Sequence, residues 1–333
     1  MDHNSNSSLH NFIQVNAVDT QQSLMNFVGL EGSDTSRLAS NRSTTDVIMP
    51  LTVLAQSPTY QEHWSDGAAV LVKSIADKPE LTHAETDHHL MLSFQCENLP
   101  LDELVSEVYT TAYQLAHQHG FKHLIRVWNY LDQINHQQQN IERYQMFCVA
   151  RHQVLEERQQ LDQPNPAATA IGGHYGHNTF VFLFSRQVGL VVENKRQVSA
   201  WQYPSQYAPK QPRFSRAMQY GDLLLCSGTA SVVGHETIHL GDLEAQFDEC
   251  MINVQALLDE SGLKASLNQG MYRFYLRDKS LVNQLLTKIQ AHLIVNYMVL
   301  EGDICRENLL IECEAVFQSV QKTVKLDKGS FDK

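Results

Sequence analysis

Hydrophobic and polar residues alternate most regularly in residues 303–317, which are predicted to form a strand. From residue 309 on, one face of this strand is apolar, and it consists of Leu309, Ile311, Cys313, Ala315 and Phe317. The opposite face carries the carboxylates of Glu312 and Glu314, because successive side chains of a strand point to opposite sides. A carboxylate inside a hydrophobic strand needs a partner or a raised pKa. The alternative is that this face of an antiparallel sheet is open to water.

The rest of the chain alternates between short strands and amphipathic helices. Apolar residues recur at helical spacing in 101–119, 141–160, 242–260 and 280–292, which predicts four helices. Short apolar runs bounded by Pro and Gly predict strands at 47–49, 68–72, 90–94, 124–131, 179–185, 189–193, 216–220, 222–227 and 271–277. Residues 1–45 are rich in Ser, Asn, Asp and Gln, so they are expected to form a loose leader with one short strand near residues 26–28.

The two halves of the chain repeat the same order of elements. The sequence HGFK precedes the strand 124–131, as SGLK precedes the strand 271–277. We therefore predict an α+β fold with two β-β-α-β-α-β halves, residues 46–200 and 214–325, joined by a linker at 201–213. A sheet that is covered by helices on one face leaves its other face free to pack against a second sheet. The two sheets should therefore face each other, with helices outside and Glu312 in the cleft between them.

A tyrosine and an arginine on one predicted helix are candidates for the lining of this cleft. Tyr144 and Arg151 lie seven residues apart on the apolar stripe of the helix 141–160, and so on one face. Arginine stays charged and must be paired when it is buried. The two side chains therefore either form an anion clamp, or Arg151 pairs with Glu142 or Glu156 at the surface.

The linker supplies further candidates, because it must cross near the interface between the halves. We choose Tyr207 from the linker and Arg216 just after it. Two more arginines, Arg273 and Arg277, share one face of a predicted strand. Each of these two either reaches the ligand or forms a salt bridge to Asp278 or Glu301.

Composition excludes several classes of protein. A formal net charge of −12 argues against nucleic acid and anionic membranes as partners, so local arginines must attract any anionic ligand. There is no apolar run long enough to span a membrane and no secretory signal. The six cysteines form no CxxC motif, which indicates reduced thiols and a cytoplasmic protein. His88-His89 and the pair His174 and His177 lack the spacing of a metal site, and no metal is expected.

Three motifs resemble the chorismatase family. They are SGTAS at 227–231, YLRD at 275–278, and DICR at 303–306 followed by LIE at 310–312. Residues 214–317 also resemble the RidA/YjgF fold, which makes each predicted half RidA/YjgF-like. Chorismatases remove pyruvate from chorismate, giving hydroxybenzoates or a dihydroxycyclohexadiene acid. The resemblance implies chorismate as the substrate and no cofactor, and the chain has neither a GxGxxG motif nor a P-loop.

The resemblance also assigns roles to residues. Glu312 occupies the position of the family's catalytic glutamate, which would protonate the methylene of the enol ether. Cys305, seven residues before it, matches a cysteine of the branch that forms 3-hydroxybenzoate, although a small buried side chain is the alternative. The turn with Gly228, Thr229 and Ala230 is expected to bind substrate, as are the candidates on the helix and linker. The bulk of Ala230 leaves a mixture with 4-hydroxybenzoate open.

Other functions stay open at this point. The first alternative is hydrolysis of chorismate to the dihydroxycyclohexadiene acid and pyruvate. The second is an imine deaminase of the RidA type, although the arginine of that group would fall near Tyr297, where none exists. The third is a non-catalytic binder of a small ligand. The chain is expected to be a monomer or a small homo-oligomer, because the free-standing fold is trimeric and a duplication satisfies similar interfaces within one chain.

Overall fold

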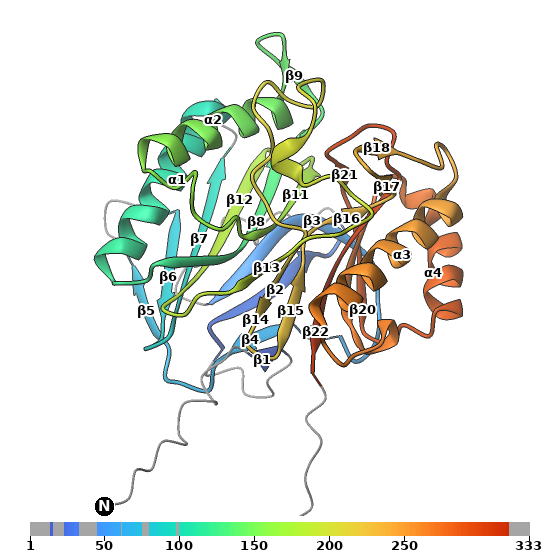
Figure 1. The fold of residues 1–333 in the computed structure, drawn as a ribbon, viewed down its shortest axis with the longest axis horizontal. Coiled ribbons are helices and arrows are strands. Elements are labelled where there is room, and N and C mark those ends of the chain that lie inside the picture. The colour runs from blue at the N-terminus through green and yellow to red at the C-terminus, as the bar shows by residue number, and fades with distance from the viewer. Residues whose placement is uncertain are drawn as a thin grey trace, which may run out of the picture.

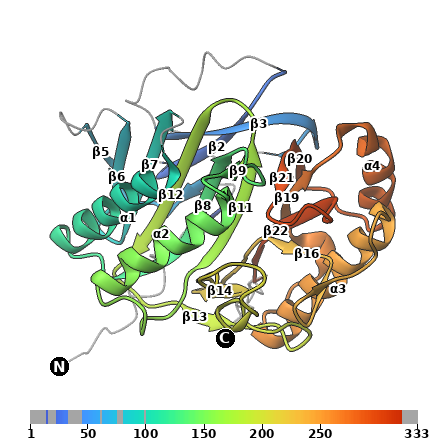
Figure 2. The same cartoon turned by 90° about the horizontal axis from the view of Figure 1, so that it is seen from above.

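The protein's structure, a computed structural model, describes residues 14–15, 23–32, 45–60, 62–74, 80–97 and 100–319. Within these ranges two β-sheets face each other, and helices cover their outer sides (Figure 1). Seen from above, two helices lie on each side of the sheets (Figure 2). The helices are α1 (Leu101–Gln118), α2 (Arg143–Glu157), α3 (Leu243–Ser261) and α4 (Val282–Ala291). This arrangement confirms the predicted α+β fold with facing sheets.

The first sheet has seven strands in the order β21-β11-β8-β12-β7-β6-β5. Their bounds are β5 (Leu71–Ser74), β6 (Leu81–Glu85), β7 (His89–Glu97), β8 (His123–Asp132), β11 (Ala167–Gly173), β12 (His177–Ser185) and β21 (Asp303–Ile304). α1 and α2 cover its outer face, where Val108, Phe147 and Phe182 belong to one buried cluster. Burial of these large apolar side chains holds the helices on the sheet.

The second sheet has eleven strands: ten in the order β1-β4-β2-β3-β20-β19-β22-β15-β14-β13, and β16, which pairs with β22. Their bounds are β1 (Gln14–Val15), β2 (Met25–Leu30), β3 (Asp46–Gln56), β4 (His63–Ser65), β13 (Leu190–Val192), β14 (Ala217–Tyr220), β15 (Leu223–Cys226), β16 (Thr229–Ala230), β19 (Met271–Leu276), β20 (Tyr297–Glu301) and β22 (Ile311–Gln318). α3 and α4 cover its outer face through a buried cluster that includes Phe247 and Leu285. Two short hairpins, β9 (Gln137–Gln138) with β10 (Ile141–Glu142) and β17 (Val232–Val233) with β18 (Glu236–Thr237), lie outside both sheets.

The two sheets contain matching parallel units, in agreement with the predicted repeat. β8 pairs parallel with β11, and α2 lies between them in the chain. β19 pairs parallel with β20, with α4 between them. Gly120 and Gly262 follow the helices that precede β8 and β19, with φ of 75° and 66°. Glycine adopts this left-handed conformation at a helix end without steric cost.

Another buried cluster fills the space between the sheets. Trp64 of β4 and Trp128 of β8 meet edge to face, with ring centroids 5.4 Å apart. The hydroxyls of Tyr130 and Tyr275, one from each sheet, lie 3.2 Å apart. Because aromatic rings bury large areas, this layer joins the two sheets.

Each half of the chain also contributes to the sheet of the other half: β3, β4 and β13 lie in the eleven-stranded sheet, and β21 lies in the seven-stranded one. β3 pairs antiparallel with β20, and β21 pairs antiparallel with β11. The prediction of one strand over 303–317 is therefore wrong, because β21 and β22 lie in different sheets and residues 305–310 connect them. The polar run Arg306-Glu307-Asn308 interrupts the alternation at this connection.

The amino-terminal region was predicted as a loose leader with one strand near residues 26–28. β2 confirms that strand, and Leu24, Met25, Phe27 and Leu30 are buried, so this strand belongs to the core. Most of the remaining leader lies outside the described residues. None of the helices in the described part of the chain is long and apolar enough to cross a membrane.

Candidate active site

A pocket of about 790 Å³ lies between α2 and β11 on one side and β16 and β22 on the other. Six parts of the chain line it: β8, α2, β11, the segment 197–216, the turn 228–232 and residues 305–312. Its polar and ionisable side chains include those of Asn129, Tyr144, Arg151, Thr169, Tyr203, Tyr207, Arg216, Cys305, Arg306 and Glu312. The pocket therefore combines one carboxyl group with three guanidinium groups.

Glu312 reaches the pocket from β22, where its backbone pairs with Ala230 on one side and Tyr275 on the other. Its side chain is only 5% exposed. Burial, and then the charge of Glu314, raise the pKa of Glu312 to about 8. A carboxyl group with this pKa keeps its proton at neutral pH and is suited to general acid catalysis.

Gly228 leaves the space that the carboxyl group of Glu312 occupies. A Cβ atom added at Gly228 would lie 1.9 Å from Oε1 of Glu312. The backbone N–H of Gly228 donates to the carbonyl of Ala168 at 3.1 Å, which holds the turn against β11. The small residue is therefore required for the close approach of turn and carboxyl.

Glu314 lies on the same face of β22 but has different surroundings. Arg273 Nε lies 2.7 Å from its carboxylate, Arg126 forms a second ion pair, and Thr169 and Tyr275 each donate a hydrogen bond at 2.6 Å. Burial opposes ionisation of Glu314, but the two arginines and the two hydrogen bonds outweigh it and lower its pKa. Glu314 is therefore a structural anion whose fixed charge helps to keep the carboxyl group two residues before it protonated.

Arg151 projects from α2 and is only 4% exposed. Its guanidinium lies 4.9 Å from the centroid of the Phe147 ring, and its Nε has no hydrogen-bond partner. Among the described residues no carboxylate lies within ion-pair distance of it, so the alternative of a surface pair with Glu142 or Glu156 is wrong. Because an unpaired buried cation is costly, Arg151 is suited to an anionic ligand.

Arg216 and Arg306 face the same pocket from other elements. Arg216 donates to the hydroxyl of Tyr203 at 2.5 Å, and its Nε is unpaired. Arg306 lies over the ring of Tyr207, 4.0 Å from the centroid, and donates to the carbonyl of His235 at 2.9 Å. Stacking on aromatic rings fixes the guanidinium planes without neutralising their charge.

Tyr144 and Cys305 are both neutral in this environment. Burial raises the pKa of Tyr144 well above its ordinary value. Burial, and then the charge of Glu312, raise the pKa of Cys305 to about 12, although Arg306 acts in the opposite direction. The thiol of Cys305 is therefore not ionised at neutral pH, and it acts as a weak donor beside the carboxyl group.

Eight of the nine predicted site residues line this one pocket, and they are Tyr144, Arg151, Tyr207, Arg216, Gly228, Ala230, Cys305 and Glu312. Thr229 does not line it. Its hydroxyl donates to the carbonyl of Ser227 at 2.8 Å, because alternation along β16 turns Thr229 away from the pocket that Ala230 faces. We leave Thr229 out of the proposed site.

Sequence reasoning did not select Arg306, Tyr203, Phe214 or Asn129 for the pocket. Arg306 adjoins Cys305 in the sequence, so the motif DICR, which drew attention to the thiol, also contains this arginine. Phe214 lies in the segment that includes Arg216, but its place in the pocket depends on how that segment crosses the cleft. Asn129 lies in the middle of an apolar strand, and its Nδ2 donates to the carbonyl of Thr169 at 3.0 Å.

Arg273 and Arg277 form salt bridges and do not line the pocket. Arg273 bridges Glu62 at 2.8 Å and Glu314 at 2.7 Å. Arg277 bridges Asp303 at 2.7 Å. Both arginines therefore form salt bridges, as one alternative expected, but their partners are not the expected Asp278 and Glu301.

One group of side chains in the described part of the chain has the composition of a metal site, and it lies away from the pocket. The ligand atoms of His83, Glu85 and His119 lie within 4.8 Å of one another. Lys73 Nζ is 2.6 Å from the same carboxylate. Burial opposes ionisation of Glu85, but Lys73 and the two histidines lower its pKa to about 2, so the group is an ionic cluster.

The fold and pocket define an enzyme of the two-sheet α+β class with a protonated glutamate beside an arginine-rich cleft. Residues 62–184 match the family model for the N-terminal part of FkbO/Hyg5-like chorismatases. A 3-hydroxybenzoate synthase of Streptomyces hygroscopicus is 34% identical over 236 residues, which cover 64% of this chain and 69% of that protein. A chorismatase of the same organism is 33% identical over 230 residues, covering 64% and 67%.

A solved structure agrees with these relatives. The crystal structure of a chorismatase superposes with a TM-score of 0.75 at 26% identity, covering 92% of this chain and 98% of that one. The chain therefore belongs to the chorismatase family. The resemblance found in its motifs is confirmed.

Proposed function

We propose that the protein converts chorismate to 3-hydroxybenzoate and pyruvate, with or without some 4-hydroxybenzoate. The observation that carries this proposal is the carboxyl group of Glu312, protonated at neutral pH in a pocket with three arginines that have no carboxylate partner. Chorismate has two carboxylates and an enol ether that reacts by protonation on carbon. The names of the relatives support the same reaction.

Glu312 donates its proton to the terminal methylene of the enol ether. The product of this step is an oxocarbenium-like centre. Water adds to its carbon, and the bond from that carbon to the ring oxygen then breaks, so that pyruvate leaves and the oxygen stays on the ring. Loss of the neighbouring ring hydroxyl and a ring proton, together as water, gives the 3-hydroxy aromatic acid. Glu314 remains ionised throughout because two arginines hold it. Its negative charge favours the protonated form of Glu312 before transfer. The nearby arginine charges stabilise the carboxylate that Glu312 leaves behind.

The arginines divide between the two carboxylates of chorismate. The charges of Arg216 and Arg306 act on Glu312, so these two guanidiniums suit the enolpyruvyl carboxylate that must lie beside the proton donor. Arg151, on α2 across the pocket, suits the ring carboxylate together with the hydroxyl of Tyr144. This arrangement places the methylene next to Glu312.

The neutral thiol of Cys305 favours the aromatic product. 3-Hydroxybenzoate and pyruvate together contain the same atoms as chorismate, so this route takes up no net water. Hydrolysis to the dihydroxycyclohexadiene acid needs one added water. Cys305 lines the pocket beside Glu312, where a polarisable group can steer the ring toward loss of a proton. Hydrolysis remains the second candidate, because the same protonation begins both reactions.

Chorismate turnover by the pure protein tests the proposal. We expect pyruvate release, followed with a coupled lactate dehydrogenase assay, and 3-hydroxybenzoate as the main product on chromatography. Glu312→Gln keeps the shape of the side chain but cannot donate a proton to carbon. We expect it to lower turnover at least about 100-fold and to keep chorismate binding within about tenfold. Absence of pyruvate release by the parent protein, or turnover by the variant above a few per cent, would contradict the proposal.

We further propose that the protein acts in the cytoplasm as a monomer or a small homo-oligomer, without metal, nucleic acid or membrane as a partner. The free thiols of all six cysteines support a reducing compartment. Packing of the two sheets on each other within one chain supports the small assembly. Sedimentation velocity at several concentrations measures the assembly directly.

A further inference from the structure

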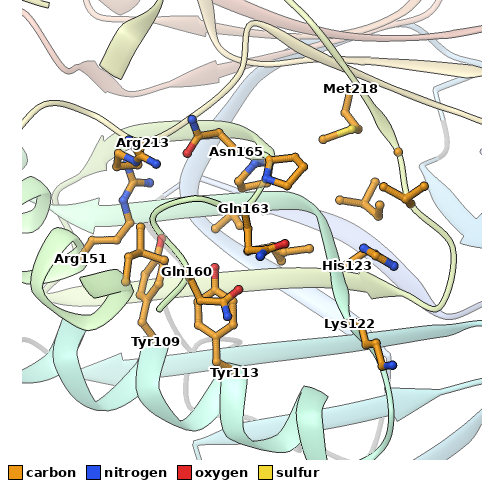
Figure 3. A pocket seen from close by; sticks show the side chains of 18 residues that line it. Tyr109, Tyr113, Lys122, His123, Arg151, Gln160, Gln163, Asn165, Arg213 and Met218 are labelled. Atoms are coloured by element: carbon orange, nitrogen blue, oxygen red, sulfur yellow. The ribbon is translucent and has the colours of Figure 1, made fainter. Parts of the chain in front are cut away.

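A second pocket, of about 640 Å³, lies on the other side of Arg151 from the proposed substrate pocket. It is bounded by α1, α2, the start of β8, the loop 160–166, residues 188–189 and the segment before β14 that contains Arg213. Arg151 is the single lining residue that the two pockets share. Figure 3 shows the guanidinium groups of Arg151 and Arg213 close together at one end, with Lys122 and His123 toward the other.

No carboxylate of the described residues forms an ion pair with either arginine at this end, and the charge of Asp162 acts on Arg213 only from a greater distance. The Nε atoms of both Arg151 and Arg213 are buried without a hydrogen-bond partner. Arg213 is half-buried and donates from its terminal nitrogen to the carbonyl of Leu161. Burial, and then the positive charge of Arg151, lower the pKa of Arg213. Two adjacent cations with unused donors are unfavourable unless an anion joins them.

The remaining lining matches a small anion with an apolar body. No Asp or Glu lines the pocket. The amides of Gln160, Gln163 and Asn165 offer neutral hydrogen-bond donors, and Leu124 and Val188 are among the apolar side chains of the wall. A carboxylate fits the fork of a guanidinium in a bidentate manner, and a short carbon chain attached to it would contact the apolar wall.

We propose that this second pocket binds a small monocarboxylate, with Arg213 and Arg151 as its anion-binding pair. The choice of pyruvate as the ligand to test rests on the proposed function, since pyruvate is the small carboxylate that the reaction would release on the other side of Arg151. A ligand bound there would contact the same guanidinium, that of Arg151, that lines the substrate pocket. A carboxylate in the second pocket therefore competes with chorismate for the hydrogen-bonding capacity of Arg151.

Calorimetric titration of the full chain with pyruvate, in the absence of chorismate, tests the site. Arg213→Gln removes the charge that belongs to this pocket alone. Lys210→Gln removes one charge from an exposed position three residues earlier and serves as a matched control. Arg216→Gln removes a guanidinium of the substrate pocket and reports binding there. Inorganic phosphate is titrated alongside to separate a carboxylate site from a general anion site.

We expect Arg213→Gln to weaken pyruvate binding at least about tenfold, while Lys210→Gln and Arg216→Gln stay within about threefold of the parent. Arg213→Lys, which keeps the charge, should fall between the parent and Arg213→Gln, and circular dichroism verifies that each variant is folded. Equal affinity of Arg213→Gln and the parent, loss of binding in Arg216→Gln, or tighter binding of phosphate than pyruvate would overturn the proposal. Because the titration contains no chorismate, its result does not depend on whether the protein converts chorismate. The binding proposal and the proposed function can therefore fail separately.

Discussion

The pKa of Glu312 predicts how activity depends on pH. A general acid must carry its proton, and the pKa of this carboxyl group is raised to about 8. We therefore expect kcat/KM for chorismate to lose nothing through ionisation of Glu312 up to about pH 7. Above pH 8 it should fall about tenfold per pH unit. Steady-state rates of pyruvate release between pH 6 and 10 measure this profile. A profile without a break between pH 7 and 9 would show that another group is the acid.

Gly228 sets the position of the Glu312 carboxyl group, so even a methyl group there should be harmful. Gly228→Ala places its Cβ within 1.9 Å of Oε1 unless the carboxyl group moves. We expect a loss of kcat of about 100-fold or more, because a small displacement of a proton donor is costly. Chorismate turnover and a thermal melt give activity and folding together. A folded variant with more than a tenth of the parent activity would show that the carboxyl group tolerates displacement.

Cys305 should decide the product and leave the first step intact. Cys305→Ala removes a polarisable thiol beside the ring but keeps the proton donor. We expect pyruvate release within about threefold of the parent and a shift from 3-hydroxybenzoate toward the dihydroxycyclohexadiene acid. Chromatography of the products measures the ratio. Unchanged products with a stability loss of about 1 kcal/mol would instead mean that Cys305 only fills space.

Single residues differ in how far the sequence reveals them. Alternation along residues 309–317 was enough to select the pair Glu312 and Glu314, because carboxylates in an apolar strand are visible without any knowledge of their neighbours. The resemblance to the chorismatase family then pointed to Glu312. The difference between Glu312 and Glu314 was not visible, because it depends on Arg126 and Arg273 from distant strands. The role of Gly228 likewise depends on a contact across 84 positions of the chain.

At the level of elements, the ionic cluster around Glu85 links β6 to the end of α1. His83 and Glu85 belong to β6, Lys73 belongs to β5, and His119 follows α1. The pKa of Glu85 is lowered to about 2 in the folded protein. A lowered pKa means that the stabilisation is present above pH 4.5 and is lost as the pH falls toward 2.

Glu85→Gln should therefore destabilise the protein at pH 7 by about 1 kcal/mol, in the range of partly exposed ion pairs. The difference from the parent should shrink between pH 5 and pH 2. Urea unfolding at several pH values measures it, and Glu97→Gln, at an exposed position of the same sheet, is the matched control. An equal difference at pH 7 and pH 3 would show that the charge of Glu85 is not responsible.

Helices were predicted closely from the sequence, and some strands were not. The four amphipathic patterns correspond to α1–α4 within a few residues at each end. β11 was missed, because its sequence AATAIGG consists largely of small residues with low strand propensity. β20 was missed as well, since a buried parallel strand shows a short apolar run without alternation. Both missed strands complete the parallel units of the repeat.

For the whole molecule, we propose that the halves 46–200 and 214–325 do not fold independently of each other. β3 and β21 each lie in the sheet of the other half. We expect a single unfolding transition, with coincident midpoints from far-ultraviolet circular dichroism and from fluorescence of the buried Trp64 and Trp128. Two transitions separated by more than about 5 °C would show that each half unfolds by itself.

The pairing of β3 with β20 also has a consequence for synthesis on the ribosome. On one of its two edges β3 pairs with β20, which is synthesised about 240 residues later. At ~5–20 residues per second this takes on the order of 10–50 s. During this interval one edge of an apolar strand has no partner, and such edges recruit other chains. The nascent chain is therefore most vulnerable to aggregation after the seven-stranded sheet has almost all its strands and before β20, which follows the last helix, has left the exit tunnel.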